Sequence, residues 1–409
     1  MTPLGAMTVS VVLEFNVAQK RVFYACQGVF FLEKNDHTEI TTIADAKQLT
    51  GVQSVGVSSS IPSVSLPDLG RFQRKYKFDS ARKDFEITIE RVISKNDFQD
   101  SSIMHTSDQG NTFYRTKSYG ATYSTNHILH EDNLGIQGEL NSNDKCLRSY
   151  DVVIIYGPDD EDRLDNSNTL TNVVYKNCVI TNLSYSFSVD GPATESITLL
   201  SRTAVYNMSG TMDEPNDTWQ TGSAQSGQVI KRSDVDFINT VLPTEAAGAF
   251  QGVSDSDVHA GLQSIDIDIA IDYTELTDVG IWRGIASGDE GKQNLWRFVN
   301  LPISVTCSFT GISRALYPYE TIDVNDENFT NDKEIKIVTD STYYTGASPT
   351  ARFNIWDLGS KNYLDNISVS GGDTSGGNVE LTLSYRNDQS DAVIANSNTV
   401  QNITYDGPY

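Results

Sequence analysis

Apolar and polar residues alternate along much of this chain, which is the pattern of half-buried β-strands. The stretch GLQSIDIDIAID, residues 261–272, shows it clearly, because isoleucine occupies every second position from 265 to 271. Side chains of a strand project alternately to its two faces, so Asp266, Asp268 and Asp272 share the face opposite the isoleucines. The stretch predicts a strand with one buried face. It leaves open whether the carboxylates form a metal site, a catalytic set or the solvated side of a sheet.

This strand has a counterpart earlier in the chain. Residues 51–71, GVQSVGVSSSIPSVSLPDLGR, match residues 261–281, GLQSIDIDIAIDYTELTDVGI, without a gap and 210 positions apart. A second pair of alternating strands follows in the same order, with residues 85–89 matching 301–305 at a separation of 216.

A strand, a turn and a second strand close each half of the chain. The first set begins at Thr181 and the matching set begins at Asp365, a separation of 184. Three blocks in one order predict a tandem duplication. The fall in separation from 216 to 184 predicts extra residues in the first copy, which we place within 95–150 as an exposed loop or a long hairpin.

The predicted fold class is mainly β, with two tandem related domains that are each a β-barrel or a β-sandwich. We expect the first domain to cover residues 1–205 and the second to cover 229–409, with residues 206–228 as a polar linker. One short helix is expected in each domain, at 41–51 and at 242–252.

The overall charge disfavours one class of function. The chain has 54 acidic and 30 basic residues and a formal net charge of -24, which repels a phosphate backbone and argues against a nucleic-acid-binding surface. No apolar stretch approaches the length of a membrane span, so we expect a soluble protein with no membrane partner, made in a cytoplasm. The four cysteines have no CxxC spacing and are expected to be core residues: Cys26, Cys146, Cys178 and Cys307.

The duplication tests the carboxylates at 266, 268 and 272. At the separation of 210 they correspond to Gly56, Ser58 and Pro62, so the matching strand persists without acids. A catalytic or metal site common to both copies is therefore not indicated. Three carboxylates on one face without a nearby base are more typical of a solvated surface than of a Ca²⁺ site.

Other candidate chemistry also lacks the required spacing. The acidic segments 159–165 and 323–332 lack the glycine and the final glutamate of an EF-hand loop. His127 and His130 match no zinc-binding HExxH arrangement. The chain contains neither a glycine-rich phosphate loop nor a GxSxG elbow. We therefore expect no catalytic residues, no metal and no cofactor, and predict that the protein is not an enzyme.

The first copy resembles the tail tube proteins of tailed bacteriophages. The resemblance rests on a Gly-x-Gln-Ser-x-Gly strand, a Leu-Gly corner and a second alternating strand, followed by the closing strands of residues 182–199. The matching positions are Gly51, Gln53, Ser54, Gly56, Leu69, Gly70, Phe85, Ile87, Ile89, Arg91 and Val92. The second copy departs from this pattern, with Asp266 at the position of the second glycine.

This resemblance implies a structural subunit of the virion tail, assembled in the host cytoplasm. Rings of such subunits stack into a tube that surrounds the channel for genome ejection, and they contact other tail proteins. Because tube rings are typically six-fold, three copies of a chain with two tube-like domains would complete a pseudo-six-fold homo-oligomeric ring. Viral DNA would pass without specific binding, since an acidic wall does not hold a polyanion. Asp266, Asp268 and Asp272 are then expected to face the channel or a contact between rings.

Three other functions stay open at this point. The chain has 19 Tyr, 16 Phe and 4 Trp, which could form sugar-stacking platforms of a glycan-binding, adhesin-like β-sandwich. A carboxylate glycosidase would need two acids at productive spacing, one with a raised pKa. A tail hub or initiator protein that forms a single ring would share the tube-like fold without forming the repeating tube.

Overall fold

The computed structural model of this chain describes its strands and the connections closest to them. The described residues are 27–34, 47–49, 51–60, 63–67, 74–79, 84–93, 117–119, 123–126, 149–156, 171–206, 229–250, 261–276, 296–300, 304–312, 332–340, 343–345, 348–350, 353–371, 379–387 and 393–397. The fold is mainly β, as predicted, and every pair of neighbouring strands in it is antiparallel.

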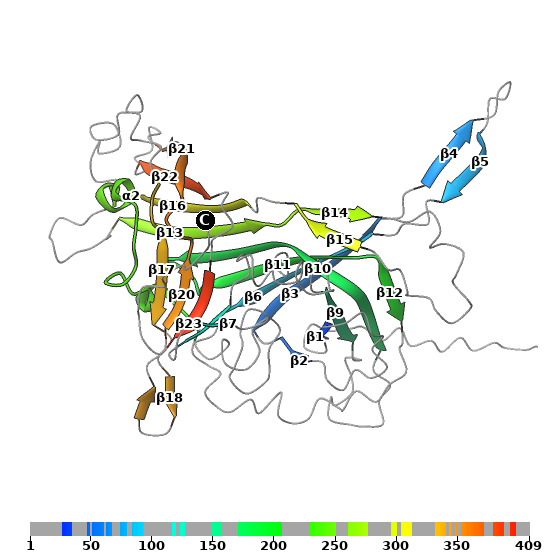
Figure 1. Ribbon diagram of the computed structural model, residues 1–409, viewed down its shortest axis with the longest axis horizontal. Coiled ribbons are helices and arrows are strands. Elements are labelled where there is room, and N and C mark those ends of the chain that lie inside the picture. Colours follow the sequence, from blue (N-terminus) through cyan, green and yellow to red (C-terminus); the bar gives the residue numbers. More distant parts are fainter. Residues whose placement is uncertain are drawn as a thin grey trace, which may run out of the picture.

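Eight antiparallel strands form one continuous sheet across both halves of the chain (Figure 1). In spatial order they are β3 (Val52–Ser60), β6 (Asp84–Val92), β11 (Thr194–Ser201), β10 (Thr171–Ser188), β13 (Leu262–Ala270), β16 (Ser304–Ile312), β22 (Glu380–Asn387) and β21 (Tyr363–Ser370). The first four strands belong to the first copy, here called unit one, and the last four belong to unit two. The pairing of β10 with β13 joins the units, and we call it the internal junction.

The two units share their pairing pattern down to the irregularities. The β3–β6 ladder skips Gln53 and the β13–β16 ladder skips Gln263, 210 positions later. The β10–β11 ladder skips Thr181, and the β21–β22 ladder skips Asp365, 184 positions later. An extra residue placed identically in both copies of a ladder is a specific feature of backbone geometry, so it marks the two units as structural repeats.

The matching glycines occupy the same tight corner. The carbonyl of Gly51 accepts a hydrogen bond from the Val92 amide at 2.9 Å, and the carbonyl of Gly261 accepts one from Ile312 at 2.8 Å. A Cβ atom at Gly51 would lie 2.4 Å from the Val92 carbonyl oxygen, and one at Gly261 would lie 2.5 Å from that of Ile312. Neither contact is possible for a larger residue without movement of the backbone, which explains glycine at the start of both strands.

The structure corrects two of the alignments made from the sequence. Register in the sheet places Ile89 of β6 at the position of Phe309, a separation of 220 and not 216. It places Ile197 of β11 at the position of Leu383, a separation of 186 and not 184. The two alignments are therefore displaced by four and by two residues, both even numbers. A slip of two or four residues keeps every side chain on its own face, so alternation alone cannot exclude it.

A second layer of strands packs against one side of the eight-stranded sheet. In unit one, the first half of β10 pairs with β9 (Ser149–Tyr156) and β12 (Thr203–Tyr206), and β9 continues to β1 (Gln27–Lys34) and β2 (Lys47–Gln48). In unit two, β20 (Phe353–Asp357) pairs with β17 (Lys336–Asp340) and β23 (Val393–Ser397). The long strand β10 thus belongs to both layers of unit one. In unit two the corresponding stretch forms two separate strands, β20 and β21, and Gly359, whose φ is +74°, lies between them.

The described part of the segment predicted as an insertion contains a hairpin. Strands β7 (Lys117–Tyr119) and β8 (Tyr123–Asn126) pair with each other, and β8 adds to the second-layer strand β23 of unit two. Three further hairpins lie beyond the layers: β4 (Ser63–Pro67) with β5 (Arg74–Asp79), β14 (Tyr273–Leu276) with β15 (Trp296–Val299), and β18 (Tyr343–Thr345) with β19 (Ser348–Thr350).

One of the two helix predictions is confirmed. The short helix α2 (Thr244–Ala249) lies within 242–252, and η4 (Arg232–Asp234) is a single 3₁₀ turn before it. The prediction for 41–51 is wrong at its end, because Lys47 and Gln48 form β2, which pairs with Phe31 and Phe30 of β1. Tertiary pairing overrides the local preference there. The rest of that prediction, 41–46, and the linker residues 207–228 lie outside the described residues.

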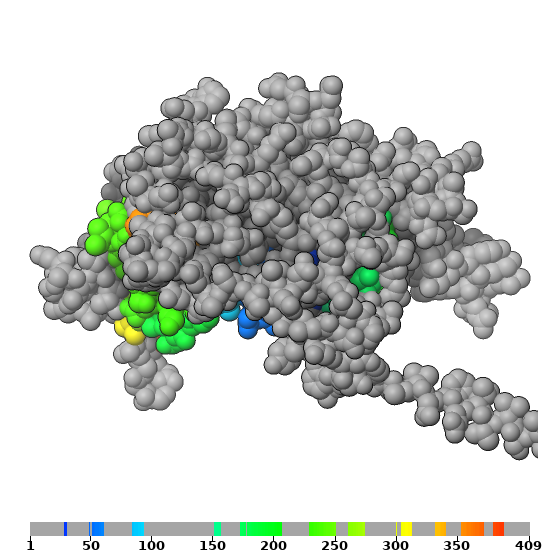
Figure 2. All heavy atoms as spheres, turned by 90° about the horizontal axis from the view of Figure 1, so that it is seen from below, coloured from blue at the N-terminus to red at the C-terminus, as the bar shows by residue number. Residues whose placement is uncertain are grey.

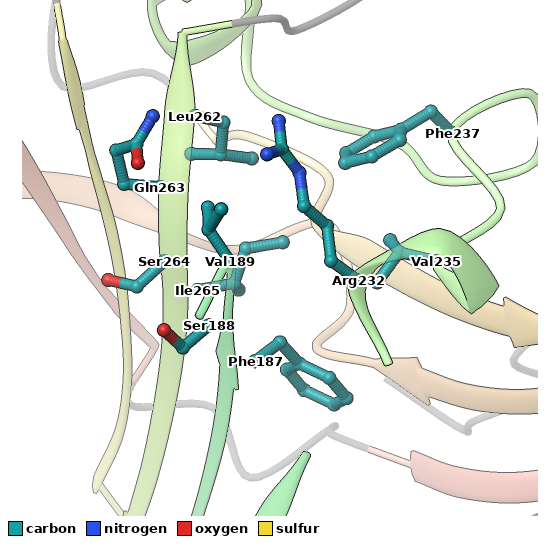
Figure 3. A pocket seen from close by; sticks show the side chains of 10 residues that line it. All are labelled: Phe187, Ser188, Val189, Arg232, Val235, Phe237, Leu262, Gln263, Ser264 and Ile265. Carbon is teal, nitrogen blue, oxygen red and sulfur yellow. The ribbon is translucent and has the colours of Figure 1, made fainter. Parts of the chain in front are cut away.

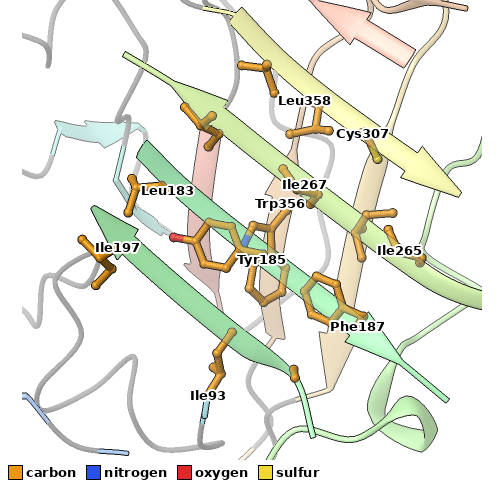
Figure 4. Packing of buried hydrophobic residues seen from close by; sticks show 14 of the residues in the cluster. Ile93, Leu183, Tyr185, Phe187, Ile197, Ile265, Ile267, Cys307, Trp356 and Leu358 are labelled. Atoms are coloured by element: carbon orange, nitrogen blue, oxygen red, sulfur yellow. The ribbon is translucent and has the colours of Figure 1, made fainter. Parts of the chain in front are cut away.

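The core lies between the two layers and is continuous from unit to unit. Trp356 of β20 is fully buried and contacts Tyr185 and Phe187 of β10 edge to face, with ring centroids 5.7 and 4.9 Å apart (Figure 4). A second-layer strand of unit two therefore packs beneath a strand of unit one. Ile265 and Ile267 of β13 extend this core, which confirms that the isoleucine face of that strand is the buried one. In the described part of the chain, no helix is long and apolar enough to span a membrane.

Candidate functional site

The side of the eight-stranded sheet that faces away from the core is lined by small polar side chains, and we call it the open face. Serine, threonine and asparagine predominate on it: Ser54, Ser58, Thr88, Ser196, Thr198, Asn182, Ser184, Ser186, Ser188, Ser264, Thr306, Ser308, Thr310, Thr382, Ser384, Asn366, Ser368 and Ser370. Side chains of neighbouring strands reach the surface together along the lower margin of the molecule in Figure 2.

Cross-strand hydrogen bonds tie this surface together. The Ser308 and Ser384 hydroxyls lie 3.0 Å apart, and those of Thr310 and Thr382 lie 3.1 Å apart. Short hydroxyls bonded to one another across strands give a flat surface with few flexible side chains.

Two of the three carboxylates predicted to be functional lie at the internal junction. The Asn182 amide donates a hydrogen bond to Asp268 at 2.9 Å, and the Ser186 hydroxyl donates one to Asp266 at 2.5 Å. Both donors belong to β10 of unit one and both acceptors belong to β13 of unit two. Asp266 and Asp268 therefore form hydrogen bonds between the two units. Unit one has no acids at the corresponding positions, Gly56 and Ser58.

All three carboxylates lie outside the core. Asp266 is exposed, Asp268 is half-buried, and Asp272 follows the end of β13, where its carbonyl accepts a hydrogen bond from the Asn300 amide at 2.9 Å. The structure does not bring the three together as a metal site. Within the described ranges, no group of three or more His, Cys, Asp or Glu side chains could hold a metal ion. Whether these acids face a channel or a contact between rings stays a prediction.

The open face is acidic as well as hydroxylated. Its charged side chains on the eight strands are Asp84, Glu86, Glu90, Asp266, Asp268, Glu380 and Arg386. Of these, Asp84 forms an ion pair with Arg202, and Glu90 accepts a hydrogen bond from Ser54 at 2.8 Å. Carboxylates outnumber cations on this surface, so it repels polyanions at neutral pH.

A shallow pocket lies at one end of the internal junction (Figure 3). Arg232, Phe187, Val235, Phe237 and Leu262 are among the side chains that line it, and it encloses about 250 Å³ of space open to solvent. Much of that volume is open solvent and not enclosed space, whereas pockets for small molecules bury most of their ligand. The lining is also mostly apolar, so we assign this pocket no ligand.

An ion pair that the sequence analysis missed lies inside unit one. Arg91 of β6 and Glu195 of β11 lie directly opposite each other, form a hydrogen-bonded ion pair and are almost completely buried. Burial raises the pKa of the neighbouring Tyr185 well above its usual value, and the negative charge of Glu195 raises it further. The sequence did contain one indication of a buried charge. Arg91 follows Ile89 by two residues and therefore continues the inward-facing series of Phe85, Ile87 and Ile89.

Most of the remaining sequence candidates lie outside the described residues. These are the acidic segment 159–165, residues 323–331 of the second acidic segment, and the histidine pair His127 and His130. The last residue of the second segment, Asp332, is exposed and accepts a hydrogen bond from Lys361 at 2.5 Å. Of the cysteines, Cys178 and Cys307 are buried, as predicted, and burial raises the pKa of the Cys307 thiol well above its usual value. A thiol held in its neutral form is a poor nucleophile, so Cys307 has a packing role.

Comparison of the chain with models of protein families gives no match, and comparison with curated proteins gives none either. Among solved structures, a chain of the anti-feeding prophage baseplate, determined by cryo-electron microscopy with six-fold symmetry, aligns with 44% of this chain and 91% of its own length. The aligned residues are 11% identical and the TM-score is 0.24. Similarity at this level does not establish a shared fold.

Proposed function

We propose that this protein is a structural subunit of a bacteriophage tail tube, which self-assembles into stacked rings around the channel for genome ejection. One observation carries the proposal: two structurally repeated units form a single sheet whose core-distal face is wide, flat, hydroxylated and acidic. The described residues that resemble tail tube proteins form the glycine corner at Gly51 and strands β3 and β6 of unit one, and the matching residues of unit two form the same corner and strands.

The chemistry of the open face suits the wall of a DNA conduit. DNA adheres to proteins mainly through phosphates neutralised by Lys and Arg, with release of counterions. Among the described side chains of the eight strands, Arg386 is the one cation that lies on the open face, among several carboxylates and many hydroxyls. A surface of this kind lets a polyanion slide past without a sequence-specific or charge-driven contact.

Glycan binding has less support from the described residues. Sugar-stacking platforms need exposed aromatic rings, and among the aromatic side chains whose exposure the structure describes, Tyr206 is the one that is largely exposed. The open face itself carries hydroxyl and carboxylate groups in place of rings. A glycosidase would need a carboxyl with a raised pKa opposite a second carboxylate, and the carboxylates of the open face instead accept hydrogen bonds from neighbouring strands.

Electron microscopy of the purified full chain tests the proposal. Negative-stain images should show rings or long tubes with a central channel, and native mass spectrometry of one ring should give three chains. Six chains per ring would overturn the pseudo-six-fold arrangement and leave the tube in place. A protein that stays monomeric at high concentration and at several salt concentrations would overturn the tube. Single rings that never stack would favour a hub or initiator protein.

A further inference from the structure

We propose that strand β21 of one copy pairs antiparallel with strand β3 of a second copy, in the register of the internal junction, which places Val369 opposite Val57. This inference rests on the proposed function, because it specifies the contact that would close a ring. It would add the edge of one sheet to the edge of the next, a mode of association in which backbone hydrogen bonds supply affinity and side chains supply register.

The internal junction is the template. Between the two repeats, β10 corresponds to β21 and β13 corresponds to β3. The chain therefore already contains one pairing of a β21-type strand with a β3-type strand. The eight-stranded sheet has a β3-type strand at one edge and a β21-type strand at the other, each without a second partner among the described strands. The β21 edge of one copy can therefore pair with the β3 edge of a second copy.

Within the described strands, both outer edges lack a partner where the template requires a free edge. Among the described strands, β3 pairs with β6 alone and β21 pairs with β22 alone. The backbone of Lys333 exchanges hydrogen bonds with Asn362, just before β21, as Tyr150 of β9 pairs with Cys178 at the corresponding place on β10. Beyond that place, β10 pairs with β13 from Asn182 to Ser188, whereas the corresponding edge of β21 has no partner among the strands that the structure describes.

Two exposed valines identify the register. Transferring the pairing of Tyr185 with Ile267 to the outer strands places Val369 directly opposite Val57. At the internal junction both members of the pair are 1% exposed, whereas Val57 is 39% exposed and Val369 is 43% exposed. They are two of the few large apolar side chains in the described ranges that face solvent. Each occupies a core-facing position that lacks a neighbouring strand, and the proposed pairing supplies that neighbour to both.

The edges also lack the features that prevent edge-to-edge association. Soluble proteins protect edge strands with Lys, Pro or inward-pointing charges. Strand β3, VQSVGVSSS, contains none of these, and in β21 Asp365 is the one charged residue, located in the bulge. In the proposed register Ser368 faces Ser58 and Asn366 faces Ser60 on the open face. No like charges meet, which matters for chains that each carry a net charge of -24.

The contact joins the end of one sheet to the start of the next, so it is heterologous and repeats until a ring closes. Each added copy extends the eight-stranded sheet with the same hydroxylated face on the same side. Three copies would give one closed wall whose junctions alternate between internal and intermolecular.

Cysteine cross-linking of mixed chains tests the register. Two single variants, Val57→Cys and Val369→Cys, are purified separately, mixed under assembly conditions and oxidised. The mixture should give a covalent dimer on a non-reducing gel, and neither variant alone should give one, which controls for the native cysteines. The pair Ser58→Cys with Ser368→Cys is a second test on the open face. Adjacent rungs of an antiparallel ladder alternate between wide and narrow Cα separations, so one of the two pairs falls on the narrow rung, which favours a disulfide.

The outcomes separate this inference from the proposed function. Cross-linking of Val369→Cys with Val55→Cys or with Ser59→Cys, in preference to Val57→Cys, would overturn the register. Tubes that form without cross-linking of either proposed pair would overturn the edge contact and leave the tube function standing. Covalent dimers without rings or tubes would support the contact and overturn the tube. A chain that neither cross-links nor assembles would overturn both.

Discussion

Arg91 and Glu195 form an ion pair inside the core of unit one, and the corresponding positions in unit two hold Gly311 and Leu381. The space above Gly311 is filled by Phe250, whose ring would lie 2.8 Å from a Cβ atom at that position. The same position in the core is therefore filled by an ion pair in unit one and by an aromatic ring beside a glycine in unit two.

This substitution between units predicts the energetics of the pair. Arg91→Met should lower the free energy of unfolding by about 3–5 kcal/mol, because it leaves the Glu195 carboxylate buried without its partner. The double variant Arg91→Met with Glu195→Leu should recover most of the loss, since two apolar residues leave no buried charge. Denaturant titration of the three proteins measures both effects. A double variant as unstable as the single one would show that the pair is needed for more than its charge balance.

The glycine corners provide a matched test of close backbone approach. Gly51→Ala and Gly261→Ala should each destabilise the fold by about 1–3 kcal/mol, because the new methyl group would overlap a carbonyl oxygen. Gly51 has the additional strain of a φ of +73°. Gly191→Ala is the control, since a Cβ atom there would have no neighbour within 4 Å and little change in thermal stability is expected. Equal effects at all three glycines would contradict the steric explanation.

Hydrogen bonds across the internal junction should be measurable one at a time. Asp268→Ala removes the acceptor of the Asn182 amide and should reduce stability by about 1 kcal/mol, as expected for a half-buried hydrogen bond to a charged group. Asp268→Asn retains an acceptor and should cost less. A double-mutant cycle with Asn182→Ala isolates the pairwise energy. Additive effects would mean that the contact contributes nothing to joining the units.

Stability should decline at alkaline pH through Tyr175. Burial, with smaller contributions from nearby groups including Tyr156, raises the pKa of Tyr175 to about 12 from its usual value of 10.0. In that interval the unfolded chain loses the phenolic proton while the folded chain keeps it, so the free energy of unfolding falls as pH rises from 10 to 12. Below pH 10 this residue contributes no pH dependence. Unfolding titrations of the native protein and of Tyr175→Phe check this, and the variant should show the smaller decline.

Adding cations to the open face should make it retain DNA. Ser308→Lys together with Ser384→Lys places two ammonium groups on adjacent strands, where the hydroxyls now lie 3.0 Å apart. Assembled material should then co-sediment with short duplex DNA at low salt and release it as salt rises. The double asparagine variant of the same positions keeps the surface neutral and should not bind. Equal retention by both would show that the open face does not contact DNA.

The sequence was sufficient to predict where strands form and which face of each strand is buried, because alternation with period two is a local property. It located Asp266 and Asp268 on the surface side of β13 for the same reason. It was insufficient for register, since even slips preserve the faces. It also gave no indication that β10 and β13 join the units, because strand pairing depends on backbone groups that every residue has.

The buried ion pair was missed for a related reason. Arg91 and Glu195 each lie in phase with the apolar residues of their own strand, but they are 104 residues apart in the chain, so only the register shows that they lie opposite each other. The helix expected near Lys47 failed because a two-residue pairing with β1 determines the backbone there. Both cases are long-range interactions that local periodicity does not encode.

The covalent link between the two units has a kinetic consequence. Strands β10 and β13 belong to one polypeptide, so their pairing is a unimolecular step whose effective concentration is set by the connecting chain and not by the amount of protein in the cell. Under the proposed edge contact, only the pairing of β21 with β3 depends on chains meeting one another. In the proposed ring of three chains, half of the junctions between units are internal to a chain. Only the other half require two chains to meet. The covalent link also lets the two junctions differ in sequence, and the carboxylates of Asp266 and Asp268 at the internal junction have no counterpart at Gly56 and Ser58 of β3.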